Sequence, residues 1–254
     1  MQPISVVIIA KNEAHILPET LRSVKLLSDD LLVCDTGSTD ATIPVALQNG
    51  ARVLEEEWKG YGHTKNKVNA EAKYDWILQL DADEVVDETL VKTILNLKLD
   101  DEKEIFKIRF KNYLGNKWVR FGEWGREERL RLFNINNAMW SELSVNEKLV
   151  YDDSCHITLL NGFILHKTML NKEEYEEKMI AYAQRNAEKD SKENKKFIWL
   201  RKFFSPSLSF FRSYILKLGF LDGLAGFVIA SMTAKYTRAK YEILHQLQNA
   251  KNKK

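Results

Sequence analysis

Cysteine is scarce in this chain, which has two cysteines among its 254 residues. Cys34 and Cys155 lie far apart and form neither the paired spacing of a zinc site nor a disulfide framework. This argues against a disulfide-stabilised secreted domain and indicates a reducing compartment. The chain also lacks the charged and apolar segments of a signal peptide before its first predicted strand, so we expect a cytoplasmic protein.

Glycine-rich phosphate loops and long apolar runs are missing as well. No G-x-G-x-x-G follows the first predicted strand and no G-x-x-x-x-G-K-[ST] occurs, which argues against a dinucleotide-binding fold and a P-loop NTPase. Within the aromatic stretch 197–234 the longest charge-free run is Gly223–Ala234, which has 12 residues. A membrane-spanning helix needs about 20 residues, so none is expected.

The composition predicts a globular protein with an uneven distribution of charge. Hydrophobic residues make up 44% of the chain and charged residues 29%, and the length allows one large domain or a domain with an appendage. Residues 1–170 carry 21 Lys and Arg against 27 Asp and Glu, whereas residues 171–254 carry 17 against 9. The basic C-terminal third indicates an anionic partner, either nucleic acid or an anionic lipid surface.

Strands and helices alternate along the first third of the chain. Apolar, β-branched runs predict strands that are buried on both faces, and the segments between them have helical spacing or helix-capping residues. Four such strands joined by short helical links predict a parallel sheet with right-handed crossovers, and therefore an α/β fold. The predicted strands are 4–10, 31–34, 51–54, 76–80, 104–112, 130–133, 148–151 and 157–165, and the clearest helices are 16–24, 64–73, 88–97 and 172–191.

Carboxylates follow the strand predicted at 76–80. Asp81, Asp83 and Glu84 come where the chain leaves the sheet, since Asp and Glu are poor strand formers. Ligands of open α/β sheets bind beyond the carboxyl ends of the strands, and an Asp-x-Asp there can hold Mg²⁺ or Mn²⁺ together with substrate phosphates. Acids also end many strands as solvated turn residues, so the pattern alone leaves both interpretations open. An EF-hand loop is excluded because Val86 stands where the tight turn needs glycine.

Several segments, taken in order, resemble a known enzyme family. SVVIIAKNE, VCDTGSTDAT, KNK before the fourth strand, and LQLDADE resemble the family-2 inverting glycosyltransferases. The later RLRLF, SVNEKL and ILHKT, with the tail FFRSYILKLGFLDGLAGF, are similar to short transferases that add a sugar, often glucose, to the inner core of bacterial lipopolysaccharide.

The resemblance implies a fold and a domain organisation. It implies the GT-A fold, an α/β fold with a Rossmann-like mixed sheet flanked by helices, with a helical C-terminal extension. The catalytic domain would cover residues 1–170, with a nucleotide-sugar half at about 1–90 and an acceptor half at about 91–170. Residues 171–254 would form the helical, basic and aromatic extension.

The resemblance also implies which residues bind the donor, a UDP-sugar. Ala10 and Glu13, at the end of the first strand, would lie along the nucleotide, and Asp35 would meet the uracil or the ribose. Lys65 would approach the diphosphate or the acid cluster, and Asp81 would bind the ribose.

Metal binding and proton transfer are implied for other residues. Asp83 would bind Mg²⁺ or Mn²⁺ bridging the two phosphates, and His166 would complete the metal shell or contact the diphosphate. Glu147 would be the catalytic base, although Asn146 replaces the His of the family's His-Glu motif. Glu123 and Glu142 are the competing candidates for that role.

The resemblance implies a glycan or glycolipid acceptor, such as the lipopolysaccharide inner core or another lipid- or protein-linked acceptor. The clustered aromatic and basic residues from about Phe197 onward predict peripheral attachment of the extension to the cytoplasmic face of the inner membrane, and no binding of nucleic acid is expected. The C-terminal helices would alternatively pack on the catalytic domain or on a second subunit.

Other classes of protein use similar acids. A glycoside hydrolase uses paired carboxylates, but Asp81 and Asp83 are too close in sequence to flank a bond from both sides. A sugar nucleotidyltransferase also uses strand-end acids and a metal, and it would release pyrophosphate. A non-catalytic adaptor at a membrane surface would not need these acids, all of which are present.

Overall fold

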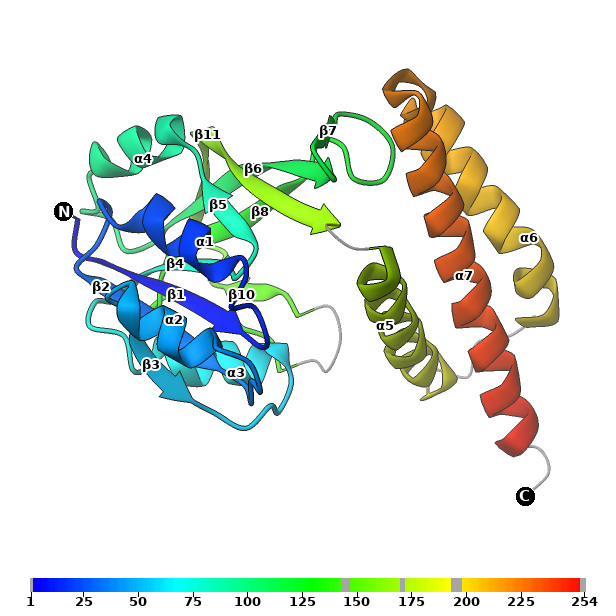
Figure 1. Cartoon of the computed structure of the whole chain (residues 1–254), viewed down its shortest axis with the longest axis horizontal. Coiled ribbons are helices and arrows are strands. Elements are labelled where there is room, and N and C mark those ends of the chain that lie inside the picture. Colours follow the sequence, from blue (N-terminus) through cyan, green and yellow to red (C-terminus); the bar gives the residue numbers. More distant parts are fainter. Residues whose placement is uncertain (1, 143–146, 170–171, 193–197, 252–254) are drawn as a thin grey trace. The chain divides into compact units, whose positions relative to one another are not determined.

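The structure, a computed structural model, describes residues 2–142, 147–169, 172–192 and 198–251 (Figure 1). The chain divides into two compact units. The first consists of Met1–Lys111 and Glu127–His166, and the second of Asn112–Arg126 and Lys167–Lys254.

A parallel half-sheet forms the N-terminal part of the first unit. Its strands run in the order β3-β2-β1-β4 and pair in parallel, as predicted from the alternation of strands and helices. The elements of this part are β1 (Ile4–Ala10), α1 (Leu17–Val24), β2 (Asp30–Asp35), α2 (Thr42–Gln48), β3 (Arg52–Glu55), α3 (Tyr61–Asn69) and β4 (Trp76–Asp81).

Antiparallel strands continue the sheet beyond β4. The order is β4-β8-β6-β11-β5, with β7 paired to β6, and β9 and β10 form a separate two-stranded sheet. The mixed sheet flanked by helices confirms the predicted GT-A type of α/β fold. These elements are β5 (Glu84–Val86), α4 (Glu88–Leu95), β6 (Glu104–Leu114), β7 (Lys117–Val119), β8 (Glu128–Asn134), β9 (Ala138–Trp140), β10 (Leu149–Tyr151) and β11 (His156–Met169).

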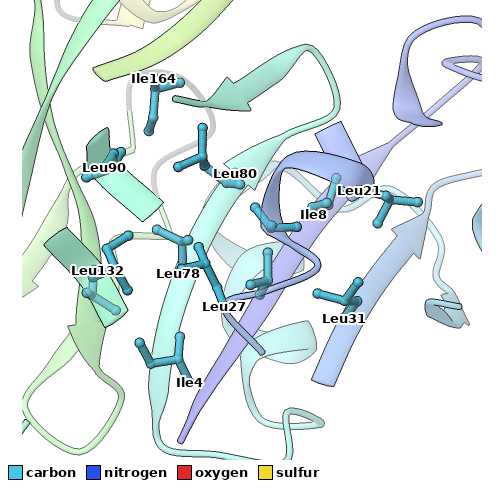
Figure 2. Close-up of a cluster of buried hydrophobic side chains, with 14 of the residues drawn as sticks. Ile4, Ile8, Leu21, Leu27, Leu31, Leu78, Leu80, Leu90, Leu132 and Ile164 are labelled. Atoms are coloured by element: carbon cyan, nitrogen blue, oxygen red, sulfur yellow. The ribbon is translucent and has the colours of Figure 1, made fainter. Parts of the chain in front are cut away.

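The central strand β1 is buried on both faces. Ile4 and Ile8 belong to one hydrophobic cluster and Val7 to another, because successive side chains of a strand point to opposite faces. The first cluster includes Leu21 of α1 (Figure 2), and the second includes Val68 of α3, so helices cover both faces. Burying each such side chain contributes about 1.5–3 kcal/mol, which fixes the ends of the strands beneath the candidate site.

Three local predictions differ from the structure. Glu84 is fully buried and begins strand β5, whereas we expected the chain to leave the sheet there. Helix α3 begins at Tyr61 rather than 64, since Gly62 has no side chain and packs against the Ser141 carbonyl, 1.9 Å from where a Cβ would lie. Strand β11 continues past His166, which pairs in register with Glu84 of β5.

The second unit contains the predicted helical C-terminal extension. Ala187, Ile198 and Leu244 form a small core that joins its three long helices. No helix among the described residues is long and apolar enough to cross a membrane. The elements are α5 (Lys172–Lys192), α6 (Ile198–Phe211), the short turns η1 (Arg212–Leu216) and η2 (Gly219–Asp222), and α7 (Leu224–Lys251).

Candidate active site

Three predicted site residues lie at one edge of the parallel sheet. Ala10 at the end of β1 pairs in register with Asp35 at the end of β2, and its neighbour Ile9 pairs with Asp81 at the end of β4. The carboxyl ends of parallel strands meet at the same edge, which is where ligands of such sheets bind. The structure therefore brings Ala10, Asp35 and Asp81 together.

Asp35 has one satisfied and one unsatisfied carboxylate oxygen. Its Oδ2 accepts hydrogen bonds from the backbone N–H groups of Gly37 (3.0 Å) and Ser38 (2.9 Å). Gly37 adopts a φ of +91°, a conformation that favours glycine. The other oxygen, Oδ1, is buried and has no hydrogen-bond partner among the described residues. An unsatisfied buried acceptor costs about 1–3 kcal/mol, so this oxygen is suited to a ligand that donates a hydrogen bond.

Glu13 lies in a loop that is tied to the next loop along the sheet edge. Its backbone N–H donates to Oγ1 of Thr42 (2.9 Å), and the N–H of Ala14 donates to Oδ2 of Asp40 (3.2 Å). Asn12, at a φ of +57°, accepts a hydrogen bond from the N–H of Thr39. These bonds hold the loops after β1 and β2 side by side, and so position Glu13 near Ala10.

A buried arginine, which the sequence analysis did not select, joins two acids of the DADE segment. Nη2 of Arg131 lies 3.1 Å from Oδ2 of Asp81 and also pairs with Oε1 of Glu84. Oε2 of Glu84 accepts a hydrogen bond from the backbone N–H of Asp81 (3.0 Å). Arg131 is 2% exposed and Glu84 is fully buried, so this buried network holds the Asp81 carboxylate in a fixed position at the edge of the sheet.

The charges in this network separate the pKa values of the two acids. Burial acts to raise the pKa of Asp81, but the positive charges of Arg131, Lys65 and Arg129 hold it well below its usual range. Burial raises the pKa of Glu84 to about 7, although Arg131 opposes the shift. Asp81 is therefore the acid that stays ionised at the sheet edge.

The sequence did contain a signal for Arg131. Arg129 and Arg131 are two residues apart in β8, an otherwise largely apolar strand, so their side chains share one face. Strand β8 pairs with β4, the strand that ends at Asp81. Two positive charges on one face of a strand beside β4 would have indicated counter-ions for the DADE acids.

Asp83 and His166 lie together next to this network. Nε2 of His166 is 3.3 Å from Oδ2 of Asp83, and both side chains are partly accessible. Burial acts to lower the pKa of His166, but the Asp83 carboxylate raises it above its ordinary value. The two residues come from different elements, since β11 carries His166 opposite Glu84 of β5.

Within the described ranges, no group of three or more His, Cys, Asp or Glu side chains is arranged to hold a metal ion. Mg²⁺ binds in many enzymes through one or two protein carboxylates together with substrate phosphates, so a complete protein shell is not required. Carboxylate oxygens suit Mg²⁺ and Mn²⁺, so the partly accessible Asp83 carboxylate is chemically able to ligate an ion that the substrate helps to bind.

Lys65 and Glu147 form a largely buried ion pair, 2.8 Å between Nζ and Oε1. The Lys65 side chain is 5% exposed and that of Glu147 16%. Nζ of Lys65 also lies 4.3 Å from the centroid of a Trp140 ring. Asn66, next to Lys65, exchanges hydrogen bonds with the backbone of Trp140 (2.7 and 2.8 Å), which fastens α3 to β9. Asn146, which replaces the family's His, lies outside the described residues.

The two competing acids have different surroundings. The side chain of Glu142 is 72% exposed, and its Oε1 lies 3.9 Å from Nδ1 of His63. Glu123 belongs to the second unit, where it pairs with Lys217 at 2.7 Å. Of the three acids considered for proton transfer, Glu147 is the one held by a buried partner in the first unit.

Comparison with known proteins matches residues 5–147 to the sequence profile described as "Glycosyl transferase family 2". An uncharacterized glycosyltransferase of Rickettsia typhi, RT0209, is 28% identical over 239 residues, which cover 90% of this chain and 82% of that protein. The lipopolysaccharide core biosynthesis glycosyltransferase LpsC of Rhizobium meliloti is 27% identical over 264 residues, covering 98% of this chain and 96% of LpsC.

Two solved structures that align with this chain do so with TM-scores below 0.5. S. aureus TarS 1–349 aligns with 98% of this chain and 91% of its own, at 14% identity and a TM-score of 0.47. Glucosyl-3-phosphoglycerate synthase from Mycobacterium tuberculosis, in complex with Mn²⁺ and UDP-glucose, aligns over 43% of each chain, at 27% identity and a TM-score of 0.35.

Proposed function

Because the chain belongs to glycosyl transferase family 2 and is thus a sugar transferase, we propose that it moves a sugar from a UDP-sugar to a hydroxyl of a glycan acceptor with inversion. The sugar we propose is glucose. The observation that carries this proposal is the shared sheet edge, where Asp35 and Asp81 end the two parallel strands that flank β1.

The donor nucleotide is proposed to lie along the ends of β1 and β2. The unsatisfied Oδ1 of Asp35 would accept a hydrogen bond from the uracil or the ribose. Ala10 and Glu13 would line the nucleotide, since the loop that carries Glu13 is fastened to the loop after β2. Asp81, kept ionised by Arg131 and Lys65, would accept from a ribose hydroxyl.

Asp83 and His166 are the residues that would hold a divalent cation, Mg²⁺ or Mn²⁺. When bound, such an ion neutralises charge that develops on the leaving diphosphate. Lys65 would contribute a further positive charge, because its ammonium group acts electrostatically on Asp81 at the same edge.

Glu147 is proposed to be the base for the acceptor. The acceptor oxygen would attack the anomeric carbon opposite the diphosphate, so that one C–O bond forms as the bond to the phosphate oxygen breaks. The hydroxyl proton would pass to the Glu147 carboxylate, a transfer typically worth about 10²–10⁴ in rate. The short strand β10 begins two residues after Glu147 and the pair with Lys65 orients its carboxylate, so the base would be held in a fixed position.

The acceptor proposed is a cell-surface glycan such as the lipopolysaccharide inner core. The support is the similarity to LpsC, whose name places it in lipopolysaccharide core biosynthesis. A lipid-linked acceptor of this kind is assembled at a membrane, and we propose that the enzyme works on the cytoplasmic side of an anionic membrane.

The experiment that tests the function is a screen for release of UDP from a panel of UDP-sugars, with and without Mn²⁺. UDP release that requires a glycan acceptor supports the proposal. Release of pyrophosphate from a nucleoside triphosphate and a sugar phosphate would identify a nucleotidyltransferase instead. Cleavage of glycosides without any nucleotide sugar would identify a hydrolase.

A further inference from the structure

Exposed apolar side chains are concentrated in one part of the second unit. Of the 20 large hydrophobic side chains that are exposed among the described residues, 12 lie between Trp199 and Phe227. Scattered exposed apolar residues are normal, but their concentration in one segment of the chain favours an interaction surface. Several of them lie around the turn between α6 and α7 (Figure 1), where Leu224 is 78%, Leu216 65% and Leu221 55% exposed.

We call the exposed residues of this turn the apolar tip. The tip consists of Phe211, Ile215, Leu216, Leu218, Phe220, Leu221, Leu224 and Phe227.

The turn that carries the apolar tip is internally well packed. The Phe210 ring lies 5.4 Å from that of Tyr214 and 5.8 Å from that of Phe227, measured between centroids. The buried carboxylate of Asp222 accepts hydrogen bonds from the backbone N–H groups of Arg120 (2.9 Å) and Phe121 (2.8 Å). The exposed leucines therefore sit on a built scaffold and not on a loose loop.

One residue of the turn, Leu218, has a backbone conformation that is unfavourable for leucine. Leu218 has a φ of +59°, in the left-handed region where a bulky side chain is an outlier. Gly226 packs so closely on η2 that a Cβ would lie 1.7 Å from the Gly219 carbonyl oxygen. A strained, close-packed turn that still exposes its leucines has the properties expected of a functional surface.

A second group of exposed apolar residues extends along helix α6. Trp199, Phe203 and Leu208 are 59%, 71% and 64% exposed, and Phe204 is 69% exposed. Arg201 and Arg212 are exposed next to them. Aromatic and basic residues together are typical of elements that lie at the boundary between lipid headgroups and acyl chains.

The charges of this surface indicate which partner it fits. Between residues 198 and 234 the sequence contains one acidic residue, Asp222. The same segment contains four basic residues: Arg201, Lys202, Arg212 and Lys217. Asp222 is 6% exposed and its carboxylate faces the 120–121 backbone. Lys217 pairs with Glu123 (2.7 Å) and Lys202 with Glu242 (3.9 Å), so Arg201 and Arg212 are the exposed cations of this segment. We propose that the apolar tip and the exposed side of α6 insert into an anionic lipid bilayer surface, with Arg201 and Arg212 at the headgroups.

This inference deepens the proposed function and rests on it for the acceptor, because a glycolipid acceptor would be presented at that same surface. The alternative occupant, a second copy of the chain, would have to bring Arg212 of each copy into an apolar contact. Glu123 and Glu242, the exposed acids that pair with lysines of this segment, already have partners in their own chain.

The test uses the full-length protein and co-sedimentation with vesicles. Vesicles of phosphatidylethanolamine and phosphatidylglycerol supply an anionic surface, and vesicles of phosphatidylcholine supply a neutral one, each at low and high salt. The tip variant is Leu216→Ser with Leu224→Ser. The matched control is Leu26→Ser with Leu47→Ser, since these leucines are 67% and 57% exposed in the other unit.

We expect the wild type and the control to sediment with anionic vesicles, more weakly at high salt, and the tip variant to lose at least about tenfold in binding. All three proteins should keep the same thermal unfolding midpoint and the same affinity for UDP. Sedimentation of the tip variant equal to that of the control would overturn the proposal. So would a wild-type dimer that becomes monomeric in the tip variant while neither protein sediments with vesicles, because the tip would then be a subunit interface.

The same samples separate this inference from the proposed function. A wild type that sediments with anionic vesicles but binds no UDP-sugar would leave the membrane surface standing and refute the transferase assignment of the site. A wild type that binds UDP-sugar but ignores vesicles would refute only the membrane surface.

Discussion

Substitution of Arg131 by Met tests the network beneath the DADE acids. Arg131 is 2% exposed and bridges Asp81 and the fully buried Glu84. The substitution retains much of the side-chain volume and removes a guanidinium that hydrogen-bonds to both carboxylates. Breaking a buried ion pair by removing one partner costs about 3–5 kcal/mol, because the remaining buried carboxylates must either stay charged without their partner or take up a proton.

The expected result is a loss of about 3–5 kcal/mol in the free energy of unfolding, measured by urea denaturation at neutral pH. Affinity for UDP should also fall, since Asp81 would lose the group that fixes its carboxylate. The matched control is Arg129→Met. Arg129 lies 3.7 Å from Oε1 of Glu84 but is 39% exposed, so its loss should cost about 1 kcal/mol or less.

A double variant separates charge from packing. If the cost of Arg131→Met comes from uncompensated charge, Glu84→Gln in the same chain should recover part of it, with a coupling energy of about 0.5–3 kcal/mol. The reasoning is refuted if Arg131→Met unfolds within about 1 kcal/mol of the wild type, or if Glu84→Gln adds its own cost without any recovery.

Three further substitutions test other parts of the account. Asp83→Asn should keep the fold but abolish turnover and weaken metal-dependent binding of UDP, and wild-type activity that persists in EDTA would remove the metal from the mechanism. Burial acts to raise the pKa of Asp30, but hydrogen bonds from Ser5, the Lys73 N–H and Arg52 hold it below its ordinary value. The stability that Asp30 contributes should therefore be complete above its unfolded pKa of about 4 and lost as pH falls through the lower folded pKa. Asp30→Asn should accordingly cost about 1–3 kcal/mol at neutral pH and progressively less in acid, and a cost independent of pH down to acid unfolding would contradict this. Gly162→Ala should lower the unfolding midpoint, because Gly162 has a φ of +108° and a Cβ there would lie 2.4 Å from the backbone N of Leu90; an unchanged midpoint would show that α4 can shift at little cost.

Periodicity in the sequence predicted the parallel half of the sheet because that signal is local. The β-branched run of β1 and the apolar positions Leu17, Leu21 and Val24 of α1 need no distant partner to be recognised, and all except the half-buried Ile9 are buried in the structure. The end of β4 at the DADE acids could be predicted for the same reason.

The partners of the site residues could not be predicted, because they depend on contacts between distant segments. Arg131 is 47 positions from Glu84, and Lys65 is 82 positions from Glu147. Glu84 was expected to leave the sheet because Glu is a poor strand residue. Arg131 of β8 pairs with the Glu84 carboxylate, and this pairing allows Glu84 to be buried in strand β5. Likewise, β11 continues through His166 because β5 supplies a pairing partner that propensity alone did not reveal.

The measurement that tests the central claim most directly is the turnover of Gln substitutions at Glu147, Glu142 and Glu123. Glutamine at 147 keeps an oxygen that can accept the hydrogen bond from Lys65, but it leaves the buried Lys65 without its counter-charge, so the unfolding midpoint of the variant is measured together with its turnover. We predict that Glu147→Gln lowers kcat by at least about 10²-fold while the affinity for UDP-sugar and metal stays nearly unchanged. The other two variants should retain most of their activity. Near-normal turnover in Glu147→Gln, with a collapse in Glu142→Gln or Glu123→Gln, would contradict the assignment of the base.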